Sequence, residues 1–177
     1  YYLAMKYYIT LFLTISIHII ISAQNQKLVP FGSDWKYLDD GSNQGTAWQS
    51  SSFNDTSWSS GPAQLGYGEG DENTIVSYGA NSSNKHITTY FRHTFTISDV
   101  SIFSNFILKL IKDDGALVYV NGQNVMRSNF GVNNYSYNDL SYSSISGSEE
   151  NIIWEEFVSP TYFQKSLLCL MNDSLLL

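Results

Sequence analysis

Hydrophobic and polar residues alternate with a period of two in several short segments of the chain, and turn-forming residues separate these segments. The clearest segments are residues 106–111, 116–120 and 123–127. Asp113–Gly115 separates the first two, and Asn121–Gly122 separates the last two. Asn-Gly is a strong hairpin signal because both residues tolerate positive φ, and Asp-Asp-Gly is a common turn sequence. The pattern therefore predicts three consecutive antiparallel strands joined at these two turns.

A further alternating segment covers residues 88–97. Because side chains point to opposite faces along a strand, Phe91 and His93 fall on one face together with Phe95 and Ile97. The other face carries mostly polar groups. The first face is therefore expected to pack in the core.

Polar segments connect the expected strands. Residues 39–45 form a loop after a short strand at 34–38, and residues 61–86 form a long excursion rich in Gly, Asn and Ser. Loops of this length in small domains are usually functional or mobile. Helix-type periodicity is weak between residues 24 and 160, so the sequence indicates an all-β antiparallel sandwich.

The beginning of the chain has the pattern of an export signal. Met5 and Lys6 precede an apolar run from Ile9 to Ile21, and small residues follow. This order is typical of a secretory signal peptide. The alternative is a membrane anchor, which needs about 20 apolar residues, more than this run provides. We expect residues 1–23 to be signal peptide and upstream sequence, and the protein to be secreted or at the cell surface, with no membrane span after cleavage.

The charge of the chain narrows the classes of partner. Sixteen acidic and nine basic residues give a formal net charge of −7. Cleavage of the leader would also remove the positive charge of Lys6. Nucleic-acid binding needs a basic face that neutralises phosphates, and anionic membranes also attract basic segments. Neither is an expected partner. Cys169 is the single cysteine, so no internal disulfide can form.

Several motifs taken together resemble a known family. They are Trp35–Tyr37, Asp40–Gly41, Trp48, Phe53–Trp58, Gly61–Gly68, Thr88–Arg92 with Phe95, and Asp113–Gly122. The series is similar to the galactose-binding-like jelly-roll modules of large secreted bacterial proteins, which often lie beside hydrolase, phosphoesterase or adhesion domains. The resemblance implies an antiparallel jelly-roll β-sandwich over residues 24–162. It says little about a ligand, because one fold hosts many functions.

The end of the chain departs from the family pattern. The family usually closes the sandwich with Gly-x-Asn followed by an apolar strand that carries a Glu and a His. Residues 163–177 lack this motif and end in leucines. Two origins fit: a truncated or frame-shifted product, and a divergent natural terminus. We expect the sandwich to lack or distort its last strand, and the tail to pack poorly or not at all.

Catalytic motifs are hard to find. His86 and His93 lack the spacing of a zinc site, and no Gly-x-Ser-x-Gly nucleophile motif is present. We expect no enzymatic activity from the chain by itself and no cofactor. The adjacent acids Asp113 and Asp114 are weak candidates for structural calcium, which takes oxygen ligands. The alternative is that they are solvated turn residues.

Carbohydrate binding is the more specific hypothesis. Sugars present apolar C–H faces and polar rims, so their sites combine an exposed aromatic ring with hydrogen-bonding side chains. The candidate residues are Trp48, Tyr67, Asp40, Asn43 and Arg92. The alternative is that the aromatic residues pack in the interior and that Arg92 pairs with an acid.

These observations predict a non-catalytic accessory module of a secreted protein, which recognises a glycan or polysaccharide and lies beside a neighbouring catalytic domain. The alternative is a structural or protein-interaction module that docks a larger secreted hydrolase and has no ligand of its own. Exposed coplanar aromatic rings would favour the first hypothesis. Buried tryptophans would favour the second.

Overall fold

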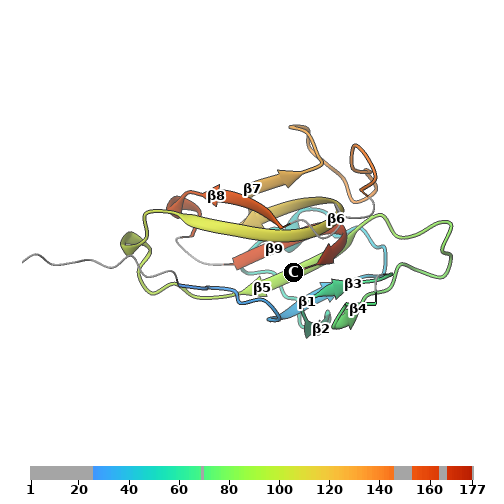
Figure 1. Cartoon of the computed structure of the whole chain (residues 1–177), viewed down its shortest axis with the longest axis horizontal. Coiled ribbons are helices and arrows are strands. Elements are labelled where there is room, and N and C mark those ends of the chain that lie inside the picture. The colour runs from blue at the N-terminus through green and yellow to red at the C-terminus, as the bar shows by residue number, and fades with distance from the viewer. Residues whose placement is uncertain (1–25, 69, 146–152, 164–166, 177) are drawn as a thin grey trace, which may run out of the picture.

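Short β-strands make up the regular structure of the chain, as the period-two pattern predicts (Figure 1). The computed structural model describes residues 26–68, 70–145, 153–163 and 167–176. The strands are β1 Asp34–Leu38, β2 Ser59–Pro62, β3 Leu65–Gly66, β4 Thr74–Ile75, β5 Thr89–Thr94, β6 Phe106–Val120, β7 Gln123–Ser128, β8 Trp154–Val158 and β9 Leu167–Leu176. Short 3-10 turns lie at η1 Ala47–Gln49, η2 Val100–Ile102 and η4 Pro160–Phe163. The all-β class is confirmed, and the narrower jelly-roll assignment stays a prediction.

The expected signal segment, residues 1–23, lies outside the described residues. Within the described part of the chain, no helix has the length and hydropathy that crossing a membrane requires.

The main sheet is antiparallel and has the strand order β2-β1-β5-β9-β6-β7, with β8 paired to β6 off this path. The short strands β3 and β4 form a separate parallel pair. Figure 1 shows β5, β9 and β6 running together through the middle of the molecule. The loop that leaves the end of β1 is therefore held by the main sheet, and the loops that leave β3 and β4 are held by this separate pair.

The first of the two predicted turns is wrong. Residues 106–120 form the single strand β6, whose first part pairs with β8 and whose last part pairs with β7. The register with β9 shifts between Asp113 and Ala116, and Asp114 has a φ of +49°. Asp113–Gly115 is thus an irregularity within a strand. Turns and bulges both use residues that tolerate positive φ, so the same Asp-Asp-Gly sequence is compatible with either.

The second predicted turn is confirmed. Val120 and Gln123 are register partners across a two-residue connection, and β6 and β7 are antiparallel neighbours. Asn121 and Gly122 have φ angles of +52° and +80°. Two consecutive positive angles are the signature of a type I′ hairpin turn, and Asn-Gly is the sequence that adopts it most readily.

The last strand is present, contrary to the expectation for the tail. β9 covers residues 167–176, of which 167–172 pair with β5 on one side and residues between 168 and 176 pair with β6 on the other. The expectation rested on a missing sequence motif, whereas pairing uses backbone groups that every residue except proline supplies. The register shift against β6 is the one distortion seen along this strand. The origin of residues 163–177 stays open.

Both faces of the main sheet are covered. Phe91, Ala116 and Val118 belong to the larger hydrophobic cluster, which includes Trp35 and Leu110. Their neighbours along the strands, Tyr90 and Leu117, point to the other face and form a second cluster with Trp48 and Trp58. The polar face expected for residues 88–97 is therefore buried at Tyr90 and Arg92, beneath the segment that contains η1, whereas Thr94 and Thr96 on the same face are exposed.

Replacing Gly122 by alanine should lower the free energy of unfolding by about 1 kcal/mol, because an L-residue is strained in the left-handed region. The nearest atom to the added Cβ would be the Gln49 carbonyl oxygen at 3.7 Å, an ordinary contact, so the loss is conformational and not steric. Urea denaturation measures it. Gln123→Ala, at the exposed start of β7, is the matched control and should change little. An unchanged midpoint for Gly122→Ala would contradict the turn.

Candidate functional site

Trp48 is buried and cannot serve as an exposed sugar platform. It lies in η1, and its side chain is 0% exposed. Its ring meets Tyr90 edge-on at 5.1 Å between centroids and Tyr119 at 5.7 Å. The sequence offered interior packing of the aromatic residues as the alternative to sugar binding. It did not show that this segment folds back over a sheet face.

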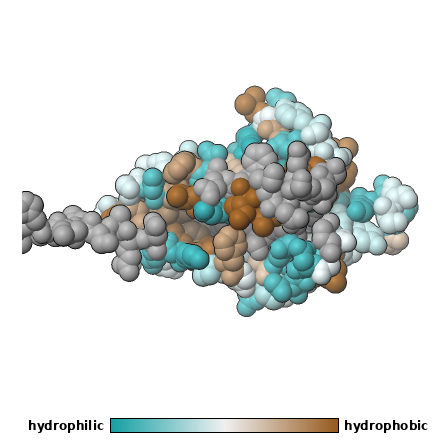
Figure 2. Space-filling model, viewed as in Figure 1, coloured by the Kyte–Doolittle hydropathy of each residue, from teal (hydrophilic) through white to brown (hydrophobic). Residues whose placement is uncertain are grey.

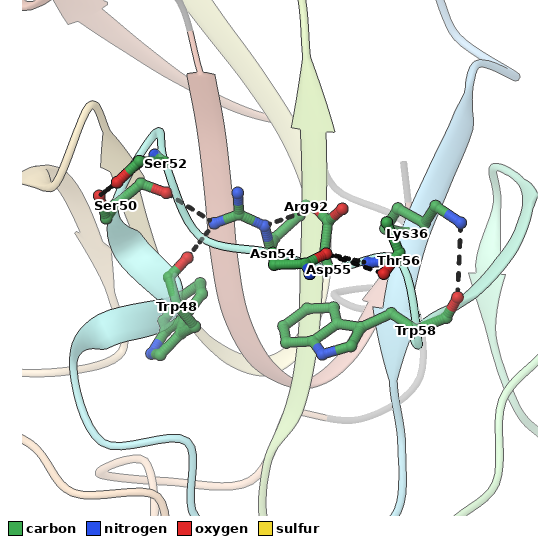
Figure 3. A network of polar contacts seen from close by, with 9 residues as sticks. All are labelled: Lys36, Trp48, Ser50, Ser52, Asn54, Asp55, Thr56, Trp58 and Arg92. Atoms are coloured by element: carbon green, nitrogen blue, oxygen red, sulfur yellow. Dashed lines mark hydrogen bonds and ion pairs between the residues drawn. The ribbon is translucent and has the colours of Figure 1, made fainter.

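Arg92, another candidate, is also part of the interior and only 2% exposed (Figure 3). Its Nε donates to Asp55 Oδ2 at 2.8 Å, forming an ion pair. Its Nη1 donates to the carbonyl oxygens of Trp48 and Ser50. The guanidinium also lies over the Phe53 ring. Arg92 therefore fastens the covering segment to β5, and no surface role follows from its position.

The remaining candidates lie on the surface at loops that meet. Asp40 and Asn43 are exposed in the loop after β1, and half-buried Tyr67 follows β3. Asp40 Oδ1 accepts hydrogen bonds from the Ser42 hydroxyl at 2.6 Å and from its backbone N–H at 2.9 Å. Chiefly the hydroxyl bond holds the pKa of Asp40 below its usual value. Burial raises the pKa of Tyr90, with a smaller contribution from the Asp40 charge.

His86 joins the loop after β1 to the loop after β4. Its ring Nδ1 lies 2.9 Å from the Asp39 carbonyl oxygen, and its backbone N–H donates to the Tyr78 carbonyl at 2.9 Å. The ring fills the space beside two glycines: a Cβ on Gly41 or Gly79 would lie 2.6 or 2.7 Å from the nearest ring atom. Larger residues at these positions would push the loops apart.

A tyrosine–lysine cluster, defined as Tyr67, Tyr78 and Lys85, sits beside this junction. The two tyrosine rings meet at 5.1 Å between centroids with an interplanar angle of 65°. Lys85 Nζ lies 4.5 Å from the Tyr67 ring centre and 5.5 Å from that of Tyr78. Tyr78 is 36% exposed, and Lys85 is exposed. Sequence reasoning found Tyr67 and missed Tyr78, Lys85 and the bridging role of His86.

His86 and His93 each place Nδ1 against a backbone carbonyl oxygen. Among the described residues, no group of three or more His, Cys, Asp or Glu side chains could hold a metal ion. The calcium candidates Asp113 and Asp114 use carboxylate oxygens to accept the backbone N–H groups of Asp114 and Ile145. Calcium binding there stays a prediction.

No protein-family model matches the chain. No curated protein matches it either.

Solved structures give distant likenesses to small parts of large glycosidases. A calcium-binding mutant of Bacteroides uniformis β-glucuronidase 2 is 17% identical, with a TM-score of 0.43 over 79% of this chain and 14% of that one. A β-glycosidase from Bacteroides vulgatus is 18% identical, with a TM-score of 0.43 over 80% and 16%. A glycoside hydrolase family 2 β-glucuronidase is 16% identical, with a TM-score of 0.49 over 80% and 13%. Likenesses at this level assign no activity to this chain.

Trp48→Ala should lower the free energy of unfolding by about 3–5 kcal/mol, the usual cost of removing a large buried aromatic side chain. Thermal and urea denaturation measure the change. Phe157→Ala is the matched control, because that ring is 68% exposed, and it should shift stability by no more than about 0.5 kcal/mol. Equal, small effects would mean that Trp48 is not a core residue.

Ser42→Ala should raise the pKa of Asp40 toward its usual value of 3.8, because it removes the hydroxyl hydrogen bond to the ionised carboxylate. A depressed pKa stabilises the folded state above the unfolded-state pKa, and this contribution disappears as the pH falls through the folded-state pKa. Carboxyl NMR titration measures both proteins. Asp99 is an internal control, because Ser101 lowers its pKa in the same manner and is unchanged. Superimposable Asp40 curves would contradict the assignment.

Proposed function

We propose that the chain is a non-catalytic accessory module of a larger secreted protein, and that it binds carbohydrate at the loops joined by His86. The observation that carries this proposal is the tyrosine–lysine cluster next to the Asp40 loop. These adjoining loops contain three of the residues that the sequence predicts to bind sugar, namely Asp40, Asn43 and Tyr67.

The chemistry of the cluster fits a sugar. A pyranose ring offers a C–H face that packs on an aromatic ring and hydroxyl groups that need hydrogen-bond partners. Tyr78 supplies an aromatic ring with part of its surface in contact with solvent. Lys85 supplies donors, and the exposed side chains of Asp40 and Asn43 lie in the adjacent loop. Tyrosine is favourable for such contacts because it orders at low entropic cost.

The framework supports recognition by making the loops rigid before a ligand arrives. Asp39 Oδ2 accepts the backbone N–H of Ser77 at 2.5 Å, so the two loops are bound at two neighbouring points, through Asp39 and through His86. The Gln44 backbone N–H donates to the Tyr90 hydroxyl at 3.3 Å and fixes the far end of the same loop to β5. Preorganised loops lose less conformational entropy on binding.

A second candidate function is docking without a sugar ligand. Trp35, Trp48 and Trp58, the tryptophans whose side chains are described, are all buried. Ile107 and Phe157 are register partners on β6 and β8, and both are exposed. Figure 2 shows hydrophobic residues among polar ones on the face where these strands run in Figure 1. An apolar pair of this kind fits a contact with a neighbouring domain.

The two functions make different predictions for a glycan array. Sugar recognition predicts binding in the millimolar to micromolar range, about −4 to −8 kcal/mol, and a loss of at least about tenfold, 1.4 kcal/mol, in Tyr78→Ala with little change in melting temperature. Tyr142→Ala, at a 69% exposed tyrosine of another loop, is the control and should bind normally. Absence of binding to every glycan on the array would overturn the proposal and leave the docking function.

A further inference from the structure

We infer that the ligand of the tyrosine–lysine cluster is an acidic sugar, whose carboxylate is bound by Lys85. This inference rests on the proposed function and adds the charge of the ligand. It depends on the contacts of the Lys85 ammonium, on the hydrogen bonds of the neighbouring acids and on the geometry of the two tyrosine rings around Nζ.

The Lys85 ammonium has no carboxylate partner among the described residues. Lys85 Nζ instead contacts the rings of Tyr67 and Tyr78, whereas the buried cation Arg92 pairs with Asp55. The chain has sixteen acidic and nine basic residues, so a basic side chain without an acidic partner is uncommon. The side chain is held over aromatic faces, which attract cations through their quadrupole.

Carboxylates of the adjoining loops accept hydrogen bonds from neutral donors. Asp39 Oδ2 accepts the Ser77 backbone N–H, and Asp40 Oδ1 accepts both Ser42 donors. Glu72 Oε2 accepts the Gly70 backbone N–H at 2.9 Å, and Asp71 Oδ1 accepts the Gln64 side-chain amide at 3.2 Å. In the described part of these loops the acids are therefore ordered by donors other than Lys85, and the ammonium keeps its hydrogen-bonding capacity for an external anion.

The ring geometry places this cation where a sugar acid would need it. Tyr67 and Tyr78 meet edge to face, and Lys85 Nζ lies 5.5 Å from the ring centre of Tyr78, a residue that is 36% exposed. A sugar packed on Tyr78 brings a ring substituent toward Lys85 Nζ. A carboxylate there would form a charge-assisted hydrogen bond, which is about twice as strong as a neutral one.

The acids in these loops also limit the charge of the ligand. Asp39, Asp40, Asp71 and Glu72 lie in the segments that carry or adjoin the cluster. Like charges repel over about 10 Å at 0.1 M salt. A polyanion such as a nucleic acid or a densely sulfated chain would meet this repulsion. A ligand with one carboxylate directed at Lys85 and no other charge would fit best.

The experiment compares oligomers of galacturonic, glucuronic and mannuronic acid with their methyl esters, which keep the sugar and remove the charge. Calorimetric titration of the full chain should show binding of at least one acid at 20 mM salt, with its ester at least about tenfold weaker. Added salt should weaken the binding of the acid and leave the binding of the ester unchanged. Lys85→Gln should bind the acid only as tightly as the ester. Lys85→Arg should still bind the acid more tightly than the ester. Lys27→Gln, at an exposed lysine before β1, is the charge control.

The outcomes separate this inference from the proposed function. Esters that bind as tightly as acids and depend on Tyr78 would overturn the charge assignment and support carbohydrate binding. An acid preference that survives in Lys85→Gln would also overturn it, because another residue would then bind the carboxylate. Absence of binding to acids, esters and neutral glycans alike would overturn both proposals. Melting temperatures of all variants should match that of the parent chain within about 2 °C, which excludes unfolding as the cause.

Discussion

A guanidinium buried in the interior requires partners for its charge and its five donors, and the cover over part of one face of the main sheet follows from how Arg92 finds them. Its ion pair with Asp55 and its bonds to the carbonyls of Trp48 and Ser50 fasten the segment between β1 and β2 across β5. That segment then buries Trp48 and Trp58 against Tyr90 and Leu117. Loss of either partner would leave an uncompensated charge beneath the cover.

This fastening also determines where the candidate site lies. The loop that carries Asp40 and Asn43 continues directly into the covering segment, and its Gln44 N–H is bonded to the Tyr90 hydroxyl. The loop therefore has a fixed position at one end and a fixed position at His86 on its other side. The surface formed by Tyr67, Tyr78 and Lys85 depends on the same junction, because His86 follows Lys85 in sequence and bonds to the Tyr78 carbonyl.

Local patterns in the sequence predicted much of the fold, and pairing between distant segments accounts for what they missed. The Asn121–Gly122 hairpin was predictable because its turn chemistry is contained in two residues. Asp113–Gly115 was misread because positive φ serves both a turn and a bulge, and only the partner strand β9 distinguishes them. Trp48 was misread for a related reason: its burial comes from Tyr90 and Tyr119, far along the chain. The same limit applies to His86, whose partner Asp39 is 47 positions away.

The position of β9 has a consequence for how the molecule assembles. Strands β5 and β6 are adjacent in sequence order but are joined in the sheet only through residues 167–176. The amino-terminal two thirds of the domain cannot close its sheet while those residues are still being synthesised. Until then β5 and β6 present open edges, which is when a β-rich chain is most exposed to mispairing. Because the completing contacts join segments far apart in sequence, closure should be slow and should follow the synthesis of residues 167–176.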